Sequence, residues 1–263
     1  MELQAIAQKL RDAEIAKKPI APLTETEAQL TAEDAYRIQL HQIQQKVSEG
    51  AVVRGLKIGL TSKAMQEMLN VHTPDYGFVL DTMVFQEQSA INAERFIQPK
   101  VEFEIAFVFK EALKGPGVTV EDVIRATDYV VPSIEIIDSR IEDWRIKFED
   151  TVADNGSSAG ALLGSKRTSL ADIDIANIRM TVFKNEEVID SATSSAVLGN
   201  PLNAVVWLAN EVGRYDIAIE PGMFVLSGAL SKALPFANGD RFQADFGEVG
   251  DVRISFQPAE VKK

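Results

Sequence analysis

The chain has 263 residues, of which 46% are hydrophobic and 25% are charged, as is typical of a soluble globular protein. It contains no cysteine, which excludes disulfides, thiolate nucleophiles and zinc–thiolate sites. With 27 basic and 39 acidic residues the formal charge is −12 at pH 7, which argues against binding to nucleic acid or to anionic lipid.

The first part of the sequence predicts two amphipathic helices. Residues 1–18 carry apolar residues at helical spacing, and Thr31 is a suitable N-cap for a second helix that stops near Gly50. The N-terminus lacks the apolar core of a signal peptide, and no run approaches the length of a membrane span, so we expect a cytoplasmic protein. We predict an N-terminal helical region at residues 1–50.

From residue 51 the sequence changes to short β-like runs separated by glycine and proline, which predicts a core domain over residues 51–263. The first run places Lys57 on one face between Gly55 and Gly59. Two flanking glycines leave room for a close approach to this lysine. A strand-end lysine that reaches solvent would show the same pattern, and the spacing alone does not decide between the two.

A short helix over residues 62–69 and a turn over residues 71–77 are expected next. The turn contains His72 and Asp75, which on composition alone are turn formers. The other histidine, His41, lies one step off the apolar stripe of the second helix and is expected to be an ordinary helix residue.

Residues 101–109 predict a strand whose odd-numbered residues form an apolar face. Glu102 and Glu104 lie on the opposite face, about 6.5–7 Å apart along the strand. A third carboxylate, Glu135, lies inside the apolar run of residues 130–137. Buried carboxylates are costly unless they are paired or bound to a metal, and oxygen ligands favour Mg²⁺, Mn²⁺ or Ca²⁺.

The pattern alone leaves a second interpretation of these glutamates open. Glu102 and Glu104 would then be exposed, and Glu135 would pair with Arg140 or Lys57. In the metal-site interpretation, three ionised acids repel one another, and a divalent cation offsets that repulsion.

Two later segments have ambiguous patterns. Residues 141–150 mix charge with large apolar residues, as in a helix over a pocket or a half-buried surface helix. Residues 154–160 are small and polar, so they either present backbone N–H groups and hydroxyls to an oxyanion or simply make a turn. Ser157 in this segment has no evident histidine base, so a serine-hydrolase triad is not expected.

The C-terminal third predicts a hairpin that begins near residue 181, a helix that begins at Asn200-Pro201, and three further strands. These strands are expected at residues 223–227, 241–246 and 252–256. The sequence shows no repeat and no low-complexity tract, so the prediction is an α+β protein with a β-rich core.

Five motifs occur in order along the chain: Gly55–Ser62 (GLKIGLTS), Pro74–Gly77 (PDYG), Glu102–Glu104 (EFE), Glu135–Arg140 (EIIDSR) and Val152–Asn155 (VADN). Together they resemble the fumarylacetoacetate hydrolase superfamily. The resemblance is closest to its hydratase/decarboxylase branch, from catechol meta-cleavage pathways, and runs from about residue 30 to the C-terminus. It implies a mixed, rolled β-core with an N-terminal helical region.

The resemblance also implies a site. A metal ion, Mg²⁺ or Mn²⁺, would be held by Glu102, Glu104 and Glu135. Three further residues would act in the pocket: Lys57 in enolate stabilisation and proton transfer, Asp75 in orienting or deprotonating water, and Ser157 in holding a carboxylate or oxyanion.

The activity implied by the resemblance is hydration of 2-hydroxypenta-2,4-dienoate, or its 2-oxo tautomer, to 4-hydroxy-2-oxopentanoate. Asp75 after Thr73-Pro74 and the segment after Arg140 favour this hydratase over its nearest rival, 4-oxalocrotonate decarboxylase. The resemblance also leaves open an acylpyruvate-type C–C hydrolase and a non-catalytic subunit. It further implies a homo-oligomer that associates with a decarboxylase or hydratase partner of the pathway.

Overall fold

The computed structural model describes residues 2–87 and 89–258. Within these residues the helices are α1 (Leu3–Ala16), α2 (Leu23–Thr26), α3 (Ala32–Ser48), α4 (Lys63–Met68), α5 (Val120–Ala126), α6 (Phe148–Ala153) and α7 (Pro201–Gly213). The strands are β1 (Val53–Gly59), β2 (Asp75–Leu80), β3 (Val84–Phe85), β4 (Ala90–Ile91), β5 (Lys100–Phe109), β6 (Thr127–Ile137), β7 (Ser158–Leu163), β8 (Arg179–Lys184), β9 (Glu187–Thr193), β10 (Phe224–Leu226), β11 (Leu234–Pro235), β12 (Arg241–Asp245) and β13 (Asp251–Phe256).

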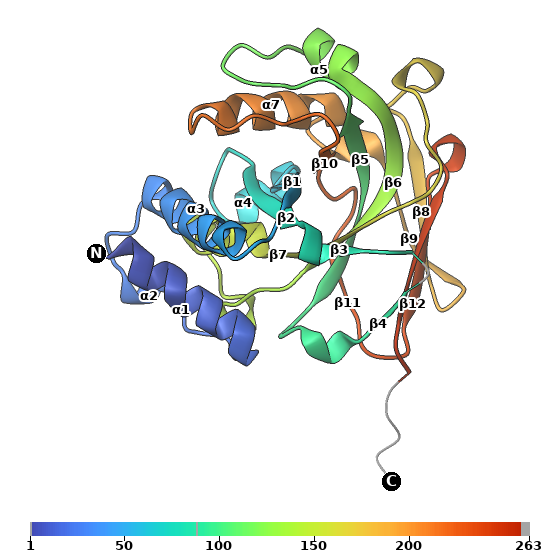
Figure 1. Ribbon diagram of the computed structural model, residues 1–263. Helices are drawn as coiled ribbons and strands as arrows, with labels where there is room; N and C mark the ends of the chain where they lie inside the picture. Colours follow the sequence, from blue (N-terminus) through green and yellow to red (C-terminus); the bar gives the residue numbers. More distant parts are fainter. Residues whose placement is uncertain (1, 88, 259–263) are drawn as a thin grey trace.

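The strands form two sheets, with α1, α2 and α3 on the side away from the smaller sheet (Figure 1). The larger sheet has the order β2-β1-β10-β5-β6-β7-β3, with β11 paired to β5, and the smaller has the order β4-β13-β12-β8-β9. Most pairs are antiparallel, but β1–β10, β3–β7 and β4–β13 are parallel. The predicted fold class, a mixed α+β fold with a curled β-core, is confirmed.

Both faces of the central strand β5 are largely buried, and the sequence predicted this firmly only for the odd-numbered, apolar face. The odd-numbered residues from Val101 to Phe109 belong to the main hydrophobic core. On the other face, Ala106 packs in a smaller apolar cluster with Val131 and Leu226. The even-numbered positions of this strand are therefore enclosed by protein as well.

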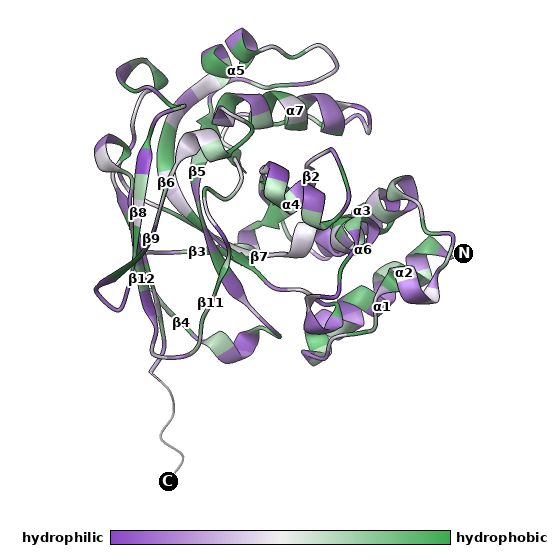
Figure 2. Ribbon diagram, turned by 180° about the vertical axis from the view of Figure 1, so that it is seen from behind, coloured by the Kyte–Doolittle hydropathy of each residue, from purple (hydrophilic) through white to green (hydrophobic). Residues whose placement is uncertain are grey.

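The smaller sheet buries one face and exposes the other. In β12, Phe242 and Ala244 are buried, whereas Arg241 and Asp245 are exposed. Figure 2 shows hydrophilic and hydrophobic colours mixed along the strands of this sheet. Such alternation is typical of an antiparallel sheet with one solvated face.

Helix α3 is attached to the sheet by buried amides. Thr31 caps the helix in a reciprocal arrangement with Asp34, as its sequence predicts. Further along, Gln39 Nε2 donates to the carbonyls of Tyr76 and Val152, both at 2.9 Å. These hydrogen bonds join the helix to β2 and α6, and the boundary that we predict at residue 50 directly follows the helix.

Most predicted elements are confirmed. The two N-terminal helices are α1 and α3, the helix predicted over residues 62–69 is α4, and the hairpin is formed by β8 and β9. The helix that begins at Asn200-Pro201 is α7, and the three C-terminal strands are β10, β12 and β13. Among the described residues, no helix is both long and apolar enough to cross a membrane.

Three segments differ from the prediction. The turn predicted over residues 71–77 ends earlier than expected, because Asp75 is the first residue of β2 and pairs with Gly59 of β1. The loop over residues 154–160 is likewise cut short by β7. Residues 141–150 form a 3₁₀ turn and the start of α6 instead of one helix. Composition favours turns or helix in these segments, but pairing with strands that are distant in sequence decides the backbone.

We expect Gln39→Leu to destabilise the protein by about 2–4 kcal/mol, because it leaves two buried carbonyls without their amide donor. Urea unfolding followed by circular dichroism measures the change. The matched control is Gln44→Leu on the exposed face of the same helix, which should shift the free energy of unfolding by less than about 0.5 kcal/mol. Equal effects of the two variants would contradict an anchoring role for Gln39.

Candidate functional site

Three glutamates from two paired strands meet in the interior. Glu102 of β5 lies directly opposite Glu135 of β6, and Glu104 lies two residues further along β5. All three are buried, with 6%, 0% and 0% of their surfaces exposed for Glu102, Glu104 and Glu135. One carboxylate oxygen from each lies within 4.8 Å of the others. The interpretation in which Glu102 and Glu104 are exposed is therefore wrong.

Burial and mutual repulsion disfavour the ionised forms of these acids. Burial raises the pKa of Glu102, and burial together with the charges of Glu135 and Glu102 raises the pKa of Glu104 well above its usual range. Burial also raises the pKa of Glu135 to about 8, although Lys57 opposes this shift. Full ionisation of the cluster therefore needs a compensating positive charge.

The oxygen atoms of the cluster are suited to a divalent cation. Glu104 Oε1 and both carboxylate oxygens of Glu135 are buried and accept no hydrogen bond from the described residues. The other oxygen of Glu104, Oε2, accepts a hydrogen bond from the Gly228 N–H at 2.7 Å. Carboxylate oxygens that are free of hydrogen-bond donors form the all-oxygen ligand set that Mg²⁺, Mn²⁺ and Ca²⁺ prefer. The residues present fit such an ion.

Lys57 points inward from β1, so the interpretation in which it reaches solvent is wrong. Its Nζ donates to the carbonyl oxygen of Gly156 at 2.9 Å and lies 3.6 Å from Glu135 Oε2. Burial lowers the pKa of Lys57, but the charges of Glu135 and Asp75 outweigh burial and raise it. Arg140, the other partner considered for Glu135, instead pairs with Asp154 at 2.5 Å.

Asp75 is buried next to the lysine, at the first residue of β2. Its Oδ2 accepts a hydrogen bond from the Thr151 hydroxyl at 3.3 Å, and its Oδ1 has no partner among the described residues. Burial raises the pKa of Asp75, with Lys57 acting in the opposite direction. A Cβ at Gly59 would lie 2.1 Å from Asp75 Oδ1, so this glycine makes room for the carboxylate.

Ser157 is held in a strained turn. Asn155, Gly156 and Ser157 have consecutive φ angles of 57°, 59° and 55°, in the left-handed region. The side chain of Asn155 supports the turn, since it accepts from the Phe78 N–H at 2.8 Å and donates to the Phe78 carbonyl at 2.9 Å. The Ser157 hydroxyl is buried and has no partner among the described residues. Strained backbone of this kind is common at functional sites.

A cavity of about 380 Å³ opens onto this group. Its polar floor includes Lys57, Asp75, Glu102 and Ser157. Its apolar wall and its mouth are formed by Leu60, Ala64, Met65, Met68, Leu69, Ile137, Trp144, Ile146 and Ala233, with Lys100 and Lys232 among them. Glu104 and Glu135 lie deeper. The structure thus places four of the six predicted site residues in the lining of one cavity, and the other two, Glu104 and Glu135, cluster with Glu102.

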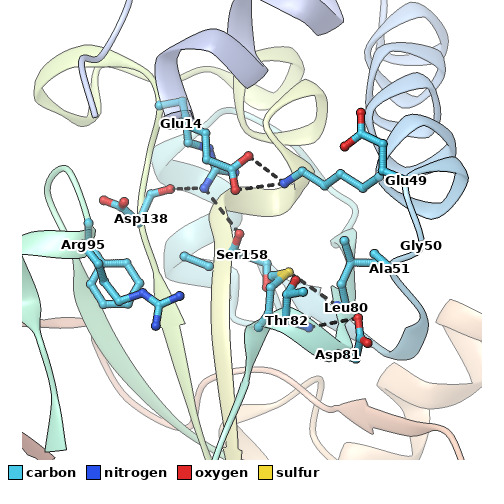
Figure 3. Close-up of a pocket in the computed structure, with 15 residues that line it drawn as sticks. Glu14, Glu49, Gly50, Ala51, Leu80, Asp81, Thr82, Arg95, Asp138 and Ser158 are labelled. Atoms are coloured by element: carbon cyan, nitrogen blue, oxygen red, sulfur yellow. Dashed lines mark hydrogen bonds and ion pairs between the residues drawn. The ribbon is translucent and has the colours of Figure 1, made fainter. Parts of the chain in front are cut away.

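A second cavity, of about 510 Å³, lies between the N-terminal helices and the start of β7 (Figure 3). Glu14 forms an ion pair there with Lys46 at 2.6 Å, and Arg140 donates to the Asp138 carbonyl at 2.6 Å. It contains none of the six predicted site residues. Glu14 and Lys46 pair with each other between α1 and α3, and Arg140 pairs with Asp154, so we do not take this cavity as the functional site.

The sequence prediction missed three residues of the cavity: Thr151, Lys100 and Trp144. Lys100 precedes Glu102 by two residues, so the period of the strand would have placed the two on one face. Trp144 has a left-handed backbone, with φ of 54°, which no sequence pattern indicates for tryptophan.

Comparisons with known proteins agree with this geometry. The family model described as fumarylacetoacetate (FAA) hydrolase C-terminal matches residues 43–257. A 2-hydroxyhexa-2,4-dienoate hydratase from Comamonas testosteroni is 44% identical over 256 residues, which cover 97% of each chain. A 2-keto-4-pentenoate hydratase from Paraburkholderia xenovorans (strain LB400) is 43% identical over 251 residues, which cover 95% of this chain and 93% of the relative.

A solved structure also matches almost the whole chain. It is 4-oxalocrotonate decarboxylase from Pseudomonas putida G7, complexed with magnesium and adipate. The TM-score is 0.94 and the sequence identity 35%, with 97% of each chain covered.

We expect Asn155→Asp to destabilise the protein by about 2–4 kcal/mol, because a carboxylate oxygen would replace the amide that donates to the buried Phe78 carbonyl. Thermal unfolding measures this loss. Asn70→Asp is the control, since Asn70 is also left-handed but exposed, and its substitution should cost less than about 0.5 kcal/mol. Asn155→Asp with unchanged stability would contradict the support that we assign to this side chain.

Proposed function

The chain belongs to the fumarylacetoacetate hydrolase family, and we propose that it is a hydratase of 2-hydroxypenta-2,4-dienoate, with 4-hydroxy-2-oxopentanoate as product. The observation that carries this proposal is a cavity lined by buried Lys57, Asp75 and Glu102, with Glu104 and Glu135 clustered on Glu102. Relatives named as hydratases, at 43% and 44% identity over nearly the whole chain, support this choice of reaction.

We propose that Glu102, Glu104 and Glu135 hold one divalent cation, Mg²⁺ or Mn²⁺. The unpaired buried oxygens of the cluster and the magnesium in the solved decarboxylase support this assignment. When bound, such a cation acts as a Lewis acid and stabilises negative charge on the C2 oxygen of the substrate.

Lys57 and Asp75 are proposed to move the protons. Ketonisation of the 2-hydroxydienoate removes the proton of the C2 hydroxyl, adds one proton at C5 and gives the conjugated 2-oxo-3-enoate. Lys57 Nζ, already fixed by the Gly156 carbonyl, has further N–H groups to stabilise the enolate and to transfer that proton. Asp75 Oδ1, which has no partner among the described residues, accepts a proton from the water whose oxygen bonds to C4, and this proton is then returned to C3 of the resulting enolate, which leaves Asp75 ionised again.

Ser157 and the apolar wall are proposed to position the substrate. The buried Ser157 hydroxyl donates a hydrogen bond to the substrate carboxylate or oxyanion. Met65 and Leu69 of α4, with Trp144 on the other side, cover the hydrocarbon part and exclude bulk water.

The second candidate is 4-oxalocrotonate decarboxylase, favoured by the solved structure with a TM-score of 0.94. The same site would serve it, because loss of CO₂ also forms an enolate at C2. The two hydratases share more sequence with this chain than the decarboxylase does, which ranks the decarboxylase second. Self-association and association with a pathway partner stay predictions of the resemblance.

With Mg²⁺ or Mn²⁺, we expect the protein to convert freshly generated 2-hydroxypenta-2,4-dienoate to 4-hydroxy-2-oxopentanoate, and we expect a chelator to abolish turnover. A parallel reaction with 4-oxalocrotonate as substrate distinguishes the two candidates. Release of CO₂ from 4-oxalocrotonate would indicate the decarboxylase. Glu104→Gln should lose at least about 100-fold in kcat/KM together with Mn²⁺ binding measured by calorimetry. Turnover that persists in the chelator would contradict the glutamate metal site, and inactivity on both substrates would favour a hydrolase or a non-catalytic subunit.

Lys57→Met and Asp75→Asn are each expected to lower kcat by about 10²–10⁴-fold, the range for removal of a general acid or base. Both variants should still bind Mn²⁺, since neither residue belongs to the proposed ligand set. Lys63→Met, an exposed lysine of α4 outside the cavity lining, serves as the charge-matched control for Lys57. Steady-state kinetics measures the change in kcat, and calorimetry measures Mn²⁺ binding. If kcat is unchanged when a residue is substituted, that residue takes no part in proton transfer.

A further inference from the structure

The carboxylate of Asp75 is held by a hydroxyl group from another element. Thr151 of α6 is buried and lines the same cavity as Asp75. Its Oγ1 donates to Asp75 Oδ2 at 3.3 Å, and among the described residues no other side chain donates to this carboxylate. A threonine hydroxyl in a helix can donate to the carbonyl four residues before it. The hydroxyl of Thr151 instead connects α6 to the first residue of β2.

The two oxygens of this carboxylate have different surroundings. Oδ2 accepts from Thr151, whereas Oδ1 is buried and has no partner among the described residues. Oδ1 lies against Gly59, where a Cβ would be 2.1 Å from this oxygen and 3.1 Å from Lys57 Nζ. The oxygen that Thr151 does not bond therefore adjoins the same glycine as the lysine.

A hydrogen bond at Oδ2 matters because a carboxylate rotates easily. The terminal torsion of aspartate is broad, so burial alone does not fix the direction in which each oxygen points. The bond from Thr151 keeps Oδ2 toward α6 and leaves Oδ1 beside Gly59. A general base must lie within hydrogen-bond distance of the proton that it accepts, and small displacements lower the rate.

Helix α6 is itself anchored on both sides of Thr151. Asp150 accepts from the N–H and the hydroxyl of Thr24, at 3.0 and 2.8 Å, which joins α6 to α2. Gln42 of α3 donates to the carbonyl of Ala153 at 2.7 Å. These bonds fix the backbone around Thr151, so the position of its hydroxyl relative to β2 is determined.

We propose that Thr151 is a positioning residue for the reaction, which orients Asp75 so that Oδ1 meets the attacking water. This inference rests on the proposed function, in which Asp75 accepts a proton from that water. Thr151 acts through Asp75 and bonds neither the substrate nor the proposed metal ion. Its removal should therefore slow the chemical step and leave substrate binding unchanged.

Thr151→Val tests this proposal, because it replaces the hydroxyl by a methyl group of similar size. We expect kcat for 2-hydroxypenta-2,4-dienoate to fall about 10–100-fold at nearly unchanged KM, and Thr151→Ser to restore kcat to within about three-fold of wild type. In an Asp75→Asn background, Thr151→Val should cause no further loss of kcat, because a residue that acts only through a carboxylate has no effect without it.

Thr127→Val is the matched control. The hydroxyl of Thr127 is also buried and donates to the Val123 carbonyl at 2.7 Å, but this residue does not line the cavity. The control should lower the midpoint of urea unfolding by about as much as Thr151→Val and leave kcat unchanged. A loss of kcat that appears only in Thr151→Val is then separate from a loss of stability.

Three outcomes would overturn the inference. They are an unchanged kcat in Thr151→Val, a higher KM as its main effect, which would indicate contact with the substrate, and a further loss in the Asp75→Asn background.

Urea unfolding tests the hydrogen bond without substrate. Thr151→Val should lower the unfolding midpoint more in the wild-type background than in Asp75→Ala, and equal shifts would contradict the bond. Absence of turnover by the wild-type protein would remove the proposed function and the catalytic role of Thr151 together, while the difference in unfolding would remain. An active wild type with an equally active Thr151→Val would remove only the role of Thr151.

Discussion

The burial of three carboxylates on two paired strands is the constraint on which the site depends. The β5–β6 register sets Glu102 opposite Glu135, and the apolar residues that share this face exclude water from the cluster. Like charges in such a medium are tolerated only beside a compensating cation. Lys57 supplies one positive charge, and the proposed metal ion supplies the rest. The turn at residues 155–157 and the glycine opposite Asp75 then complete a cavity around this charge arrangement.

The period of β5 made much of this predictable. Alternation placed Glu102 and Glu104 together, and an acid inside an apolar run marked Glu135. Asp75 was identifiable only through the family resemblance, because Thr-Pro-Asp is typical of a turn, and its burial comes from pairing with β1. The position of Trp144 in the cavity lining was not predictable, because it depends on the hydrogen bond that the indole Nε1 donates to the carbonyl of Gln98, which is distant in sequence.

Backbone strain is concentrated around the cavity. Left-handed residues occur at Asp143 and Trp144 on one side and at Asn155 and Ser157 on the other. Each pair is held by side chains that bond to neighbouring backbone, as Asn155 does to Phe78. Conformations of this kind persist only where the surroundings determine them fully. The cavity is therefore rigid on the sides that carry Ser157 and the indole ring, which suits a site that must hold reacting atoms in place.

The two carbonyls that Gln39 joins are next to functional side chains. Tyr76 directly follows Asp75, and Val152 directly follows Thr151, the residue that donates to the Asp75 carboxylate. The span shared with the family model begins at residue 43, inside α3 and after Gln39. In a chimera of two relatives that are joined at residue 43, the first part of α3, with Gln39, would come from one parent and the cavity from the other. The spacing between Asp75 and its hydroxyl donor would then depend on how well the two parents match, so recombination inside α3 would alter activity without altering any residue of the cavity.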